Sequence, residues 1–135
     1  MKPWIEYLFC KIPIVRNAKN EDAICIEFAS KLQRMTRQGE FNCVWFHVAN
    51  EYAGESKPLY GAKLKAMGKV AGVSDYIFMK EGKNLALEFK TTDKQSKQSK
   101  GQKCFEQWCK DVGIPYELVR SSQEGFDALK KHGIM

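Results

Sequence analysis

The sequence lacks the features of a membrane or secreted protein. None of its apolar runs reaches the length of about 20 residues that a transmembrane helix needs. The N-terminal run Leu8-Phe9-Cys10 is interrupted by Lys11 and Pro13, and no signal-peptide core or cleavage site follows it. We therefore expect no membrane association, and a cytoplasmic location (the host cytoplasm if the source is a virus) rather than secretion.

The cysteines also lack a pattern that would build a site. The chain has 5 of them, an odd number, and no Cys-x-x-Cys occurs. A disulfide framework needs paired cysteines, and a structural zinc site needs closely spaced ones, so neither is expected. Free thiols in a reducing cytosol are the prediction.

Internal repeats and low-complexity linkers are absent as well. The length of 135 residues is typical of one domain, and 44% hydrophobic residues can build one core. We predict a single domain over residues 1–135. Residues 1–20 are expected to form an extended arm that packs on the domain or on a second subunit.

Positive charge is present in excess and is unevenly distributed. The formal net charge is +6, and residues 57–103 carry half of the 22 basic residues, all lysine, against four acidic ones. Two of those four are Asp75 and Glu88. A positive field around two acids favours an anionic partner such as a phosphate backbone over a plain solvated surface.

These two acids fall on a predicted β-hairpin. The runs Tyr76-Ile77-Phe78-Met79 and Leu85-Ala86-Leu87-Glu88-Phe89-Lys90 are rich in strand-forming residues and flank a short turn. A two-residue loop at Glu81-Gly82 pairs Met79 with Asn84, Ile77 with Ala86 and Asp75 with Glu88. Directly opposite residues lie about 5 Å apart on one face, and Lys90 shares that face.

The predicted cluster of two carboxylates and one ammonium suggests a chemistry. Two close carboxylates repel each other unless a proton or a cation lies between them. Mg²⁺ and Mn²⁺ favour carboxylate oxygens together with water and phosphate, which is the outline of a metal-assisted hydrolysis site. The plainer alternative is a surface Glu-Lys pair beside an unrelated Asp.

A helix is predicted over residues 21–38. Ile24, Phe28, Leu32 and Met35 form one apolar stripe, with Asn20 as the expected N-cap and Gly39 as the expected stop. Glu21 extends the stripe toward the helix start, whereas Glu27 falls on its flank.

The remaining elements give a mixed sheet. The pattern predicts a strand over 41–48, a short helix or irregular turn over 60–68, a helix over 100–112, a strand over 116–119 and a last helix capped by Ser121 or Ser122. The order is helix, three strands, helix, strand, helix. The crossover to the last strand should make it parallel to its neighbour, with helices on both faces.

The sequence is compatible with two roles for Gln102. It lies one turn before Phe105 on the apolar face of its helix, which points it toward Glu88 and Lys90. It also completes a capping box with Ser99. The expectation is that the side chain can serve only one of these roles well.

The residues Gly72-Val73-Ser74-Asp75, Leu87-Glu88-Phe89-Lys90 and Gln102 resemble the Asp…Glu-x-Lys…Gln signature of the VRR-NUC nucleases. These belong to the PD-(D/E)xK superfamily of restriction-endonuclease-like enzymes. The resemblance extends from about residue 21 to about residue 125. The family often has proline before the Asp; Ser74 stands here instead, which removes a backbone restraint but no ligand.

The resemblance implies an α/β, restriction-endonuclease-like fold and a Mg²⁺- or Mn²⁺-dependent endonuclease that hydrolyses DNA. Asp75, Glu88, the Phe89 carbonyl and Glu21 would be metal ligands; Lys90 would position or activate water, and Gln102 would complete the site. Glu21 has an equally weighted alternative role, in which its negative charge only stabilises the N-terminus of the helix. Small stand-alone members look dimeric and act on branched DNA, so a homodimer acting on branched or junction DNA is expected.

Further residues are expected to contact the substrate: His47, Asn50, Lys63, Lys65, Lys94, Lys97 and Lys100. For His47 a structural role is the alternative, and a lone histidine in a strand is more often structural than catalytic. The alternative function is a nucleic-acid-binding module that kept the fold and lost the chemistry. RNA ranks below DNA as the substrate because the sequence shows no aromatic platform for single strands.

Overall fold

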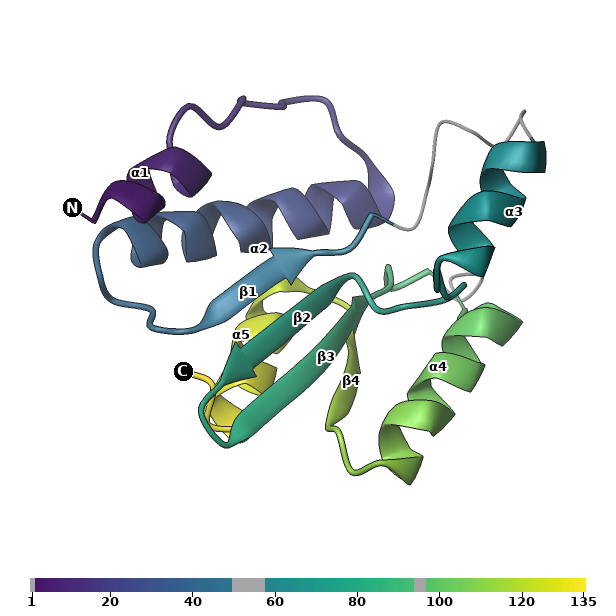
Figure 1. Ribbon diagram of the computed structural model, residues 1–135. Coiled ribbons are helices and arrows are strands. Elements are labelled where there is room, and N and C mark those ends of the chain that lie inside the picture. Colours follow the sequence, from purple (N-terminus) through teal and green to yellow (C-terminus); the bar gives the residue numbers. More distant parts are fainter. Residues whose placement is uncertain (1, 50–57, 94–96) are drawn as a thin grey trace.

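The computed structural model describes residues 2–49, 58–93 and 97–135 (Figure 1). The described residues form a mixed α/β structure, as predicted. In chain order its elements are α1 (Pro3–Phe9), α2 (Asn20–Arg37), β1 (Val44–His47), α3 (Pro58–Ala66), β2 (Tyr76–Lys80), β3 (Lys83–Phe89), α4 (Lys100–Asp111), β4 (Tyr116–Val119) and α5 (Ser122–Lys131). None of the described helices is long and apolar enough to cross a membrane.

The four strands form one sheet in the order β1-β2-β3-β4. β1, β2 and β3 pair antiparallel, and β4 is parallel to β3 as the crossover rule predicted. The hairpin register is confirmed: Ile77 lies opposite Ala86, and Met79 lies opposite Asn84. Gly82 in the loop has a positive φ of 72°, which suits the tight two-residue turn.

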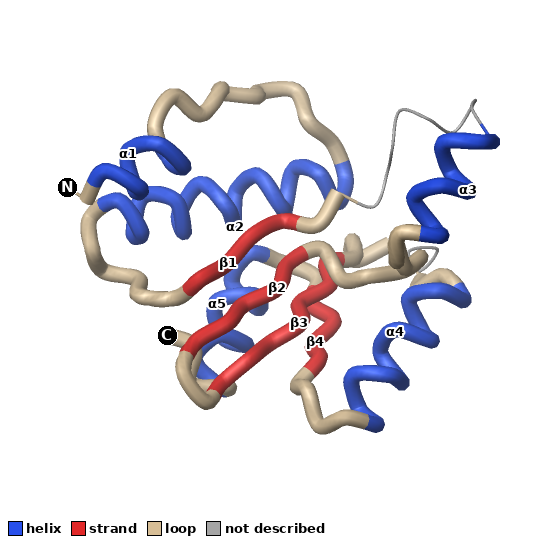
Figure 2. The backbone as a smooth tube through the Cα atoms, viewed as in Figure 1, coloured by secondary structure: helices blue, strands red, loops and turns tan. Residues whose placement is uncertain are grey.

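The core lies between one face of this sheet and helices α2 and α5 (Figure 2). Alternate strand residues point into it, among them Phe78, Leu87 and Phe89. Phe28 of α2 is fully buried at its centre, with its ring centroid 4.9 Å from that of Phe89 and 5.0 Å from that of Phe126.

Helix α4 packs against the other face of the sheet and covers it incompletely. Cys109 is buried, but Trp108 and Val112 are 56% and 63% exposed. An apolar groove of about 290 Å³ runs between α4 and the hairpin, where Ile77 and Ala86 face Phe105. Helices therefore lie on both faces, and one face keeps an apolar surface open to solvent.

Three details of the predicted elements need correction. Pro3–Phe9 is a helix rather than an extended arm; proline fits its first turn, and Arg37 of α2 donates a hydrogen bond of 3.0 Å to the Phe9 carbonyl. Lys19, not Asn20, is the N-cap of α2, and Asn20 begins the helix with a φ of 55°. The strand predicted over 41–48 is shorter, Val44–His47. Residues 58–66 are helical, so the segment predicted as either a short helix or an irregular turn is a helix.

Candidate functional site

Asp75 lies where β1, β2 and β3 converge, one residue before β2 begins. Its carbonyl accepts a hydrogen bond of 2.7 Å from the Val48 amide at the end of β1. Its carboxylate oxygen Oδ2 accepts one of 2.8 Å from the Phe89 amide at the end of β3. Bonds to both neighbouring strands fix the backbone and the side chain of this acid.

Glu88 lies beside Asp75 and is only 1% exposed. Burial raises the pKa of Glu88 most, followed by the charge of Asp75, a hydrogen bond with Asp75 and the charge of Glu21. Lys90 lowers it, and the net change in the pKa is from 4.5 to about 9. Without a cation, Glu88 therefore holds a proton at neutral pH. A side-chain hydrogen bond joins the two acids, which lie just beyond the last bonded pair of the hairpin, Tyr76 and Leu87.

Lys90 completes the cluster at the strand end. It is 8% exposed, and its amide donates a hydrogen bond of 2.9 Å to the Val119 carbonyl of β4. Its ammonium lies near enough to Glu88 to favour the charged carboxylate. A lysine this buried is costly unless nearby negative charge stabilises it.

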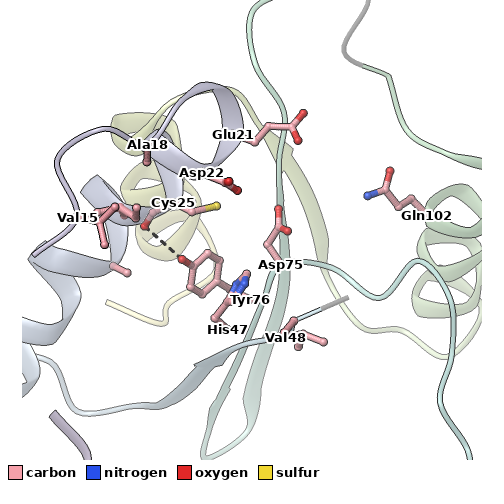
Figure 3. Close-up of a pocket in the computed structure, with 13 residues that line it drawn as sticks. Val15, Ala18, Glu21, Asp22, Cys25, His47, Val48, Asp75, Tyr76 and Gln102 are labelled. Atoms are coloured by element: carbon pink, nitrogen blue, oxygen red, sulfur yellow. Dashed lines mark hydrogen bonds between the residues drawn. The ribbon is translucent and has the colours of Figure 1, made fainter. Parts of the chain in front are cut away.

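Glu21 in the first turn of α2 faces the same site. Together with Asp75 and Gln102 it lines a cavity of about 710 Å³ (Figure 3). Glu27 lies elsewhere: its side chain is 62% exposed and is 3.9 Å from the Lys31 ammonium. The geometry thus favours Glu21 over Glu27 as the helix acid nearest the two strand-borne carboxylates.

Gln102 serves both roles, so the expectation that it could serve only one is wrong. Its Nε2 donates a hydrogen bond of 3.1 Å to Glu88 Oε2, and its Oε1 accepts one of 2.8 Å from the Ser99 amide. The Gln102 amide in turn donates to the Ser99 hydroxyl over 3.2 Å. The two ends of one side-chain amide have opposite hydrogen-bonding character, so the capping box orients the group that holds Glu88.

Two contacts missed by the sequence analysis hold α4 at this site. A Cβ on Gly72, whose φ is 86°, would collide with backbone atoms of Gly101 and Gln102. Gln98 Nε2 donates hydrogen bonds of 3.1 Å both to Glu106 Oε1 and to the Tyr116 hydroxyl of β4. The sequence shows that Gly72 lies in the loop before Asp75, but nothing in it indicates that Gly72 contacts the start of α4.

The predicted substrate-binding residues are dispersed. His47 is exposed at the end of β1 and lines the cavity, whereas the exposed residues Lys63 and Lys65 of α3, Lys97, and Lys100 at the start of α4 do not. Asn50 and Lys94 lie outside the described residues. Asp22 and Cys25 of α2 also line the cavity and were not predicted.

The donor set suits a hard divalent cation. Among the described residues, no group of three His, Cys, Asp or Glu side chains could hold a metal ion. A site of two carboxylates completed by a backbone carbonyl, water and substrate phosphate is nonetheless common for Mg²⁺. The raised pKa of Glu88 beside Asp75 shows that two negative charges are unfavourable here and that a positive charge is favoured.

Comparisons with models of protein families, with curated proteins and with solved structures found no match for this chain.

Proposed function

We propose that this protein is a Mg²⁺- or Mn²⁺-dependent deoxyribonuclease of the VRR-NUC type, with a restriction-endonuclease-like core. The observation that carries the proposal is the pairing of the buried Glu88 with the half-buried Asp75, with the buried Lys90 beside them at the end of a hairpin. Burying two ionisable groups beside a third is expensive, and such groups concentrate at functional sites.

Each residue has a defined task in this proposal. Asp75 and Glu88 would hold the cation as carboxylates, the Phe89 carbonyl would be the further protein ligand, and Glu21 would contact the cation through a bound water. The bound cation supplies Lewis-acid polarisation of the phosphoryl group. Gln102 holds one Glu88 oxygen and leaves the other to a ligand. Lys90 orients the attacking water and offsets the charge that develops at phosphorus.

The lysines outside the cavity bind the DNA backbone. Lys63 and Lys65 on α3 and Lys97 and Lys100 before and at the start of α4 are exposed. Figure 1 shows α3 and the N-terminal end of α4 at the end of the sheet where β3 finishes. Phosphates bound there would lie near the strand-end carboxylates, and the binding would weaken as salt increases.

The test is cleavage of plasmid, flap and four-way-junction DNA with Mg²⁺, with Mn²⁺ and with chelator. Asp75→Ala and Lys90→Ala should each abolish cleavage while leaving the fold intact by circular dichroism. Glu27→Ala, on the same helix as Glu21 but outside the site, should retain activity. Full activity of the Asp75 or Lys90 variant would refute the proposal. Salt-sensitive DNA binding that ignores both metal and Glu88→Gln would establish the non-catalytic module instead.

The open apolar face supports the further proposal of a homodimer. Val44, Phe46 and Met79 on the sheet are 59%, 45% and 44% exposed, and Trp108 and Val112 of α4 lie across the apolar groove. Contiguous apolar surface of this kind marks interaction sites, and a two-fold pair of active sites suits branched DNA. Light scattering should give a dimer mass that Phe46→Asp converts to a monomer mass; an unchanged monomer would exclude the dimer.

A further inference from the structure

The cavity at the candidate site extends well beyond the carboxylates. It continues between the start of α2, the end of β1 and residues 15–18 (Figure 3). Apolar side chains such as Val15, Ala18 and Ile26 line this extension. Among the described residues that line the cavity, none is lysine or arginine. A phosphate would therefore find no side-chain cation here, so the extension suits an uncharged part of a substrate.

The polar groups of the extension are hydrogen-bond acceptors and a flat ring. Asp22 is exposed at the start of α2, and its charge acts on the nearby Cys25 thiol together with the charges of Asp75 and Glu88. The exposed His47 ring lies 5.0 Å from the Tyr76 ring, centroid to centroid. Tyr76 is buried and donates a hydrogen bond of 3.2 Å to the Cys25 carbonyl, so the ring behind His47 is fixed.

We propose that this extension binds one unpaired nucleobase next to the phosphodiester that is cleaved. The inference rests on the nuclease function proposed above and adds the nature of its substrate. The whole cavity, of about 710 Å³ including the end beside the carboxylates, is in the range of small-molecule sites, and a base has to leave the duplex stack to enter it. The base stacks on His47, as bases do on aromatic rings in single-strand binding proteins.

Asp22 gives the pocket a base preference. A carboxylate accepts hydrogen bonds from the exocyclic amino group of cytosine, and adenine and guanine carry amino groups too. Thymine has no amino group, and its one donor, N3–H, lies between two carbonyl oxygens that Asp22 repels. The pocket therefore favours cytosine and purines over thymine, and the enzyme prefers junctions, flaps or mismatches that leave a nucleotide unpaired.

The experiment compares DNA flaps that differ only in the unpaired residue at the cleavage position: cytosine, thymine or an abasic site. With Mg²⁺, the abasic flap should lower kcat/KM by about tenfold for the native protein, the amount expected for one stacked base. His47→Ala should remove most of that difference, and Asp22→Asn should reduce the preference for cytosine over thymine. Glu27→Gln should behave as the native protein.

Equal cleavage of all three flaps by the native protein would overturn the pocket while leaving the nuclease intact. If the native protein cleaves no DNA at all, the proposed function fails, and the pocket is then judged by binding alone. The probe is the fluorescence of 2-aminopurine deoxyriboside, which carries no phosphate, measured without metal. Quenching that is lost in His47→Ala would support the pocket, and unchanged fluorescence would refute it.

Discussion

Replacing Glu88 by glutamine is expected to change how the stability of the metal-free protein depends on pH. The Glu88 carboxyl has a pKa of about 9 in the folded protein against 4.5 ordinarily, because burial and Asp75 disfavour its charge. The folded state therefore holds a proton that the unfolded state releases. Since the folded-state pKa is raised, its contribution is complete below the unfolded pKa and is lost as pH rises toward 9.

The size of the effect follows from that linkage. One proton difference changes the free energy of unfolding by about 1.4 kcal/mol per pH unit. Between about pH 5.5 and about pH 7.5, the native protein should thus lose roughly 3 kcal/mol relative to Glu88→Gln, which has nothing to ionise. That corresponds to a fall in Tm of about 10 °C relative to the variant.

Urea denaturation and thermal scans in chelator, at matched ionic strength, measure this difference. Glu27→Gln is the matched control, because this glutamate is exposed on α2 and its variant should follow the native pH dependence. Adding Mg²⁺ at the higher pH should restore the stability of the native protein and leave Glu88→Gln nearly unchanged. Parallel pH curves for the native protein and Glu88→Gln would refute the view that Glu88 is a buried, protonated partner of Asp75.

Two other substitutions test how the site is positioned. Gly72→Ala forces a Cβ into the backbone of Gly101 and should move the first turn of α4, which carries Gln102. Because Gln102 then no longer orients Glu88, kcat at saturating Mg²⁺ should fall at least about tenfold. Retained kcat would show that the close approach is not needed. Tyr116→Phe removes an acceptor of Gln98 and should cost about 1 kcal/mol of stability in urea, with a smaller effect on kcat than Gln102→Ala. Equal losses of kcat would place the Tyr116 hydroxyl in the site itself.

The hairpin was predictable because a two-residue loop fixes every pair along it. Once Glu81-Gly82 forms that loop, Ile77 must oppose Ala86, and the carboxylates must meet beyond the last bonded pair. The alternation of apolar residues then placed Phe78 and Leu87 in the core and Glu88 on the other face.

The contacts around α4 were not predictable, because they join segments whose spacing the sequence does not encode. Gln98 reaches Tyr116 across 18 positions, and Gly72 meets Gly101 through backbone atoms that leave no residue-type signature beyond glycine. The dual role of Gln102 depends on how the start of α4 is placed against β3, and the local sequence does not encode that placement. The helix Pro3–Phe9 has no apolar stripe long enough to be recognised and is held by Arg37 and α2.

A crystal structure of the protein grown with Mn²⁺ tests the central claim most directly, through anomalous scattering at the strand ends. We expect a Mn²⁺ peak in contact with carboxylate oxygens of both Asp75 and Glu88, with Lys90 beside it. The proposed metal site would be contradicted if the protein cleaves DNA in Mn²⁺ but crystals grown at saturating Mn²⁺ show no ion at either carboxylate.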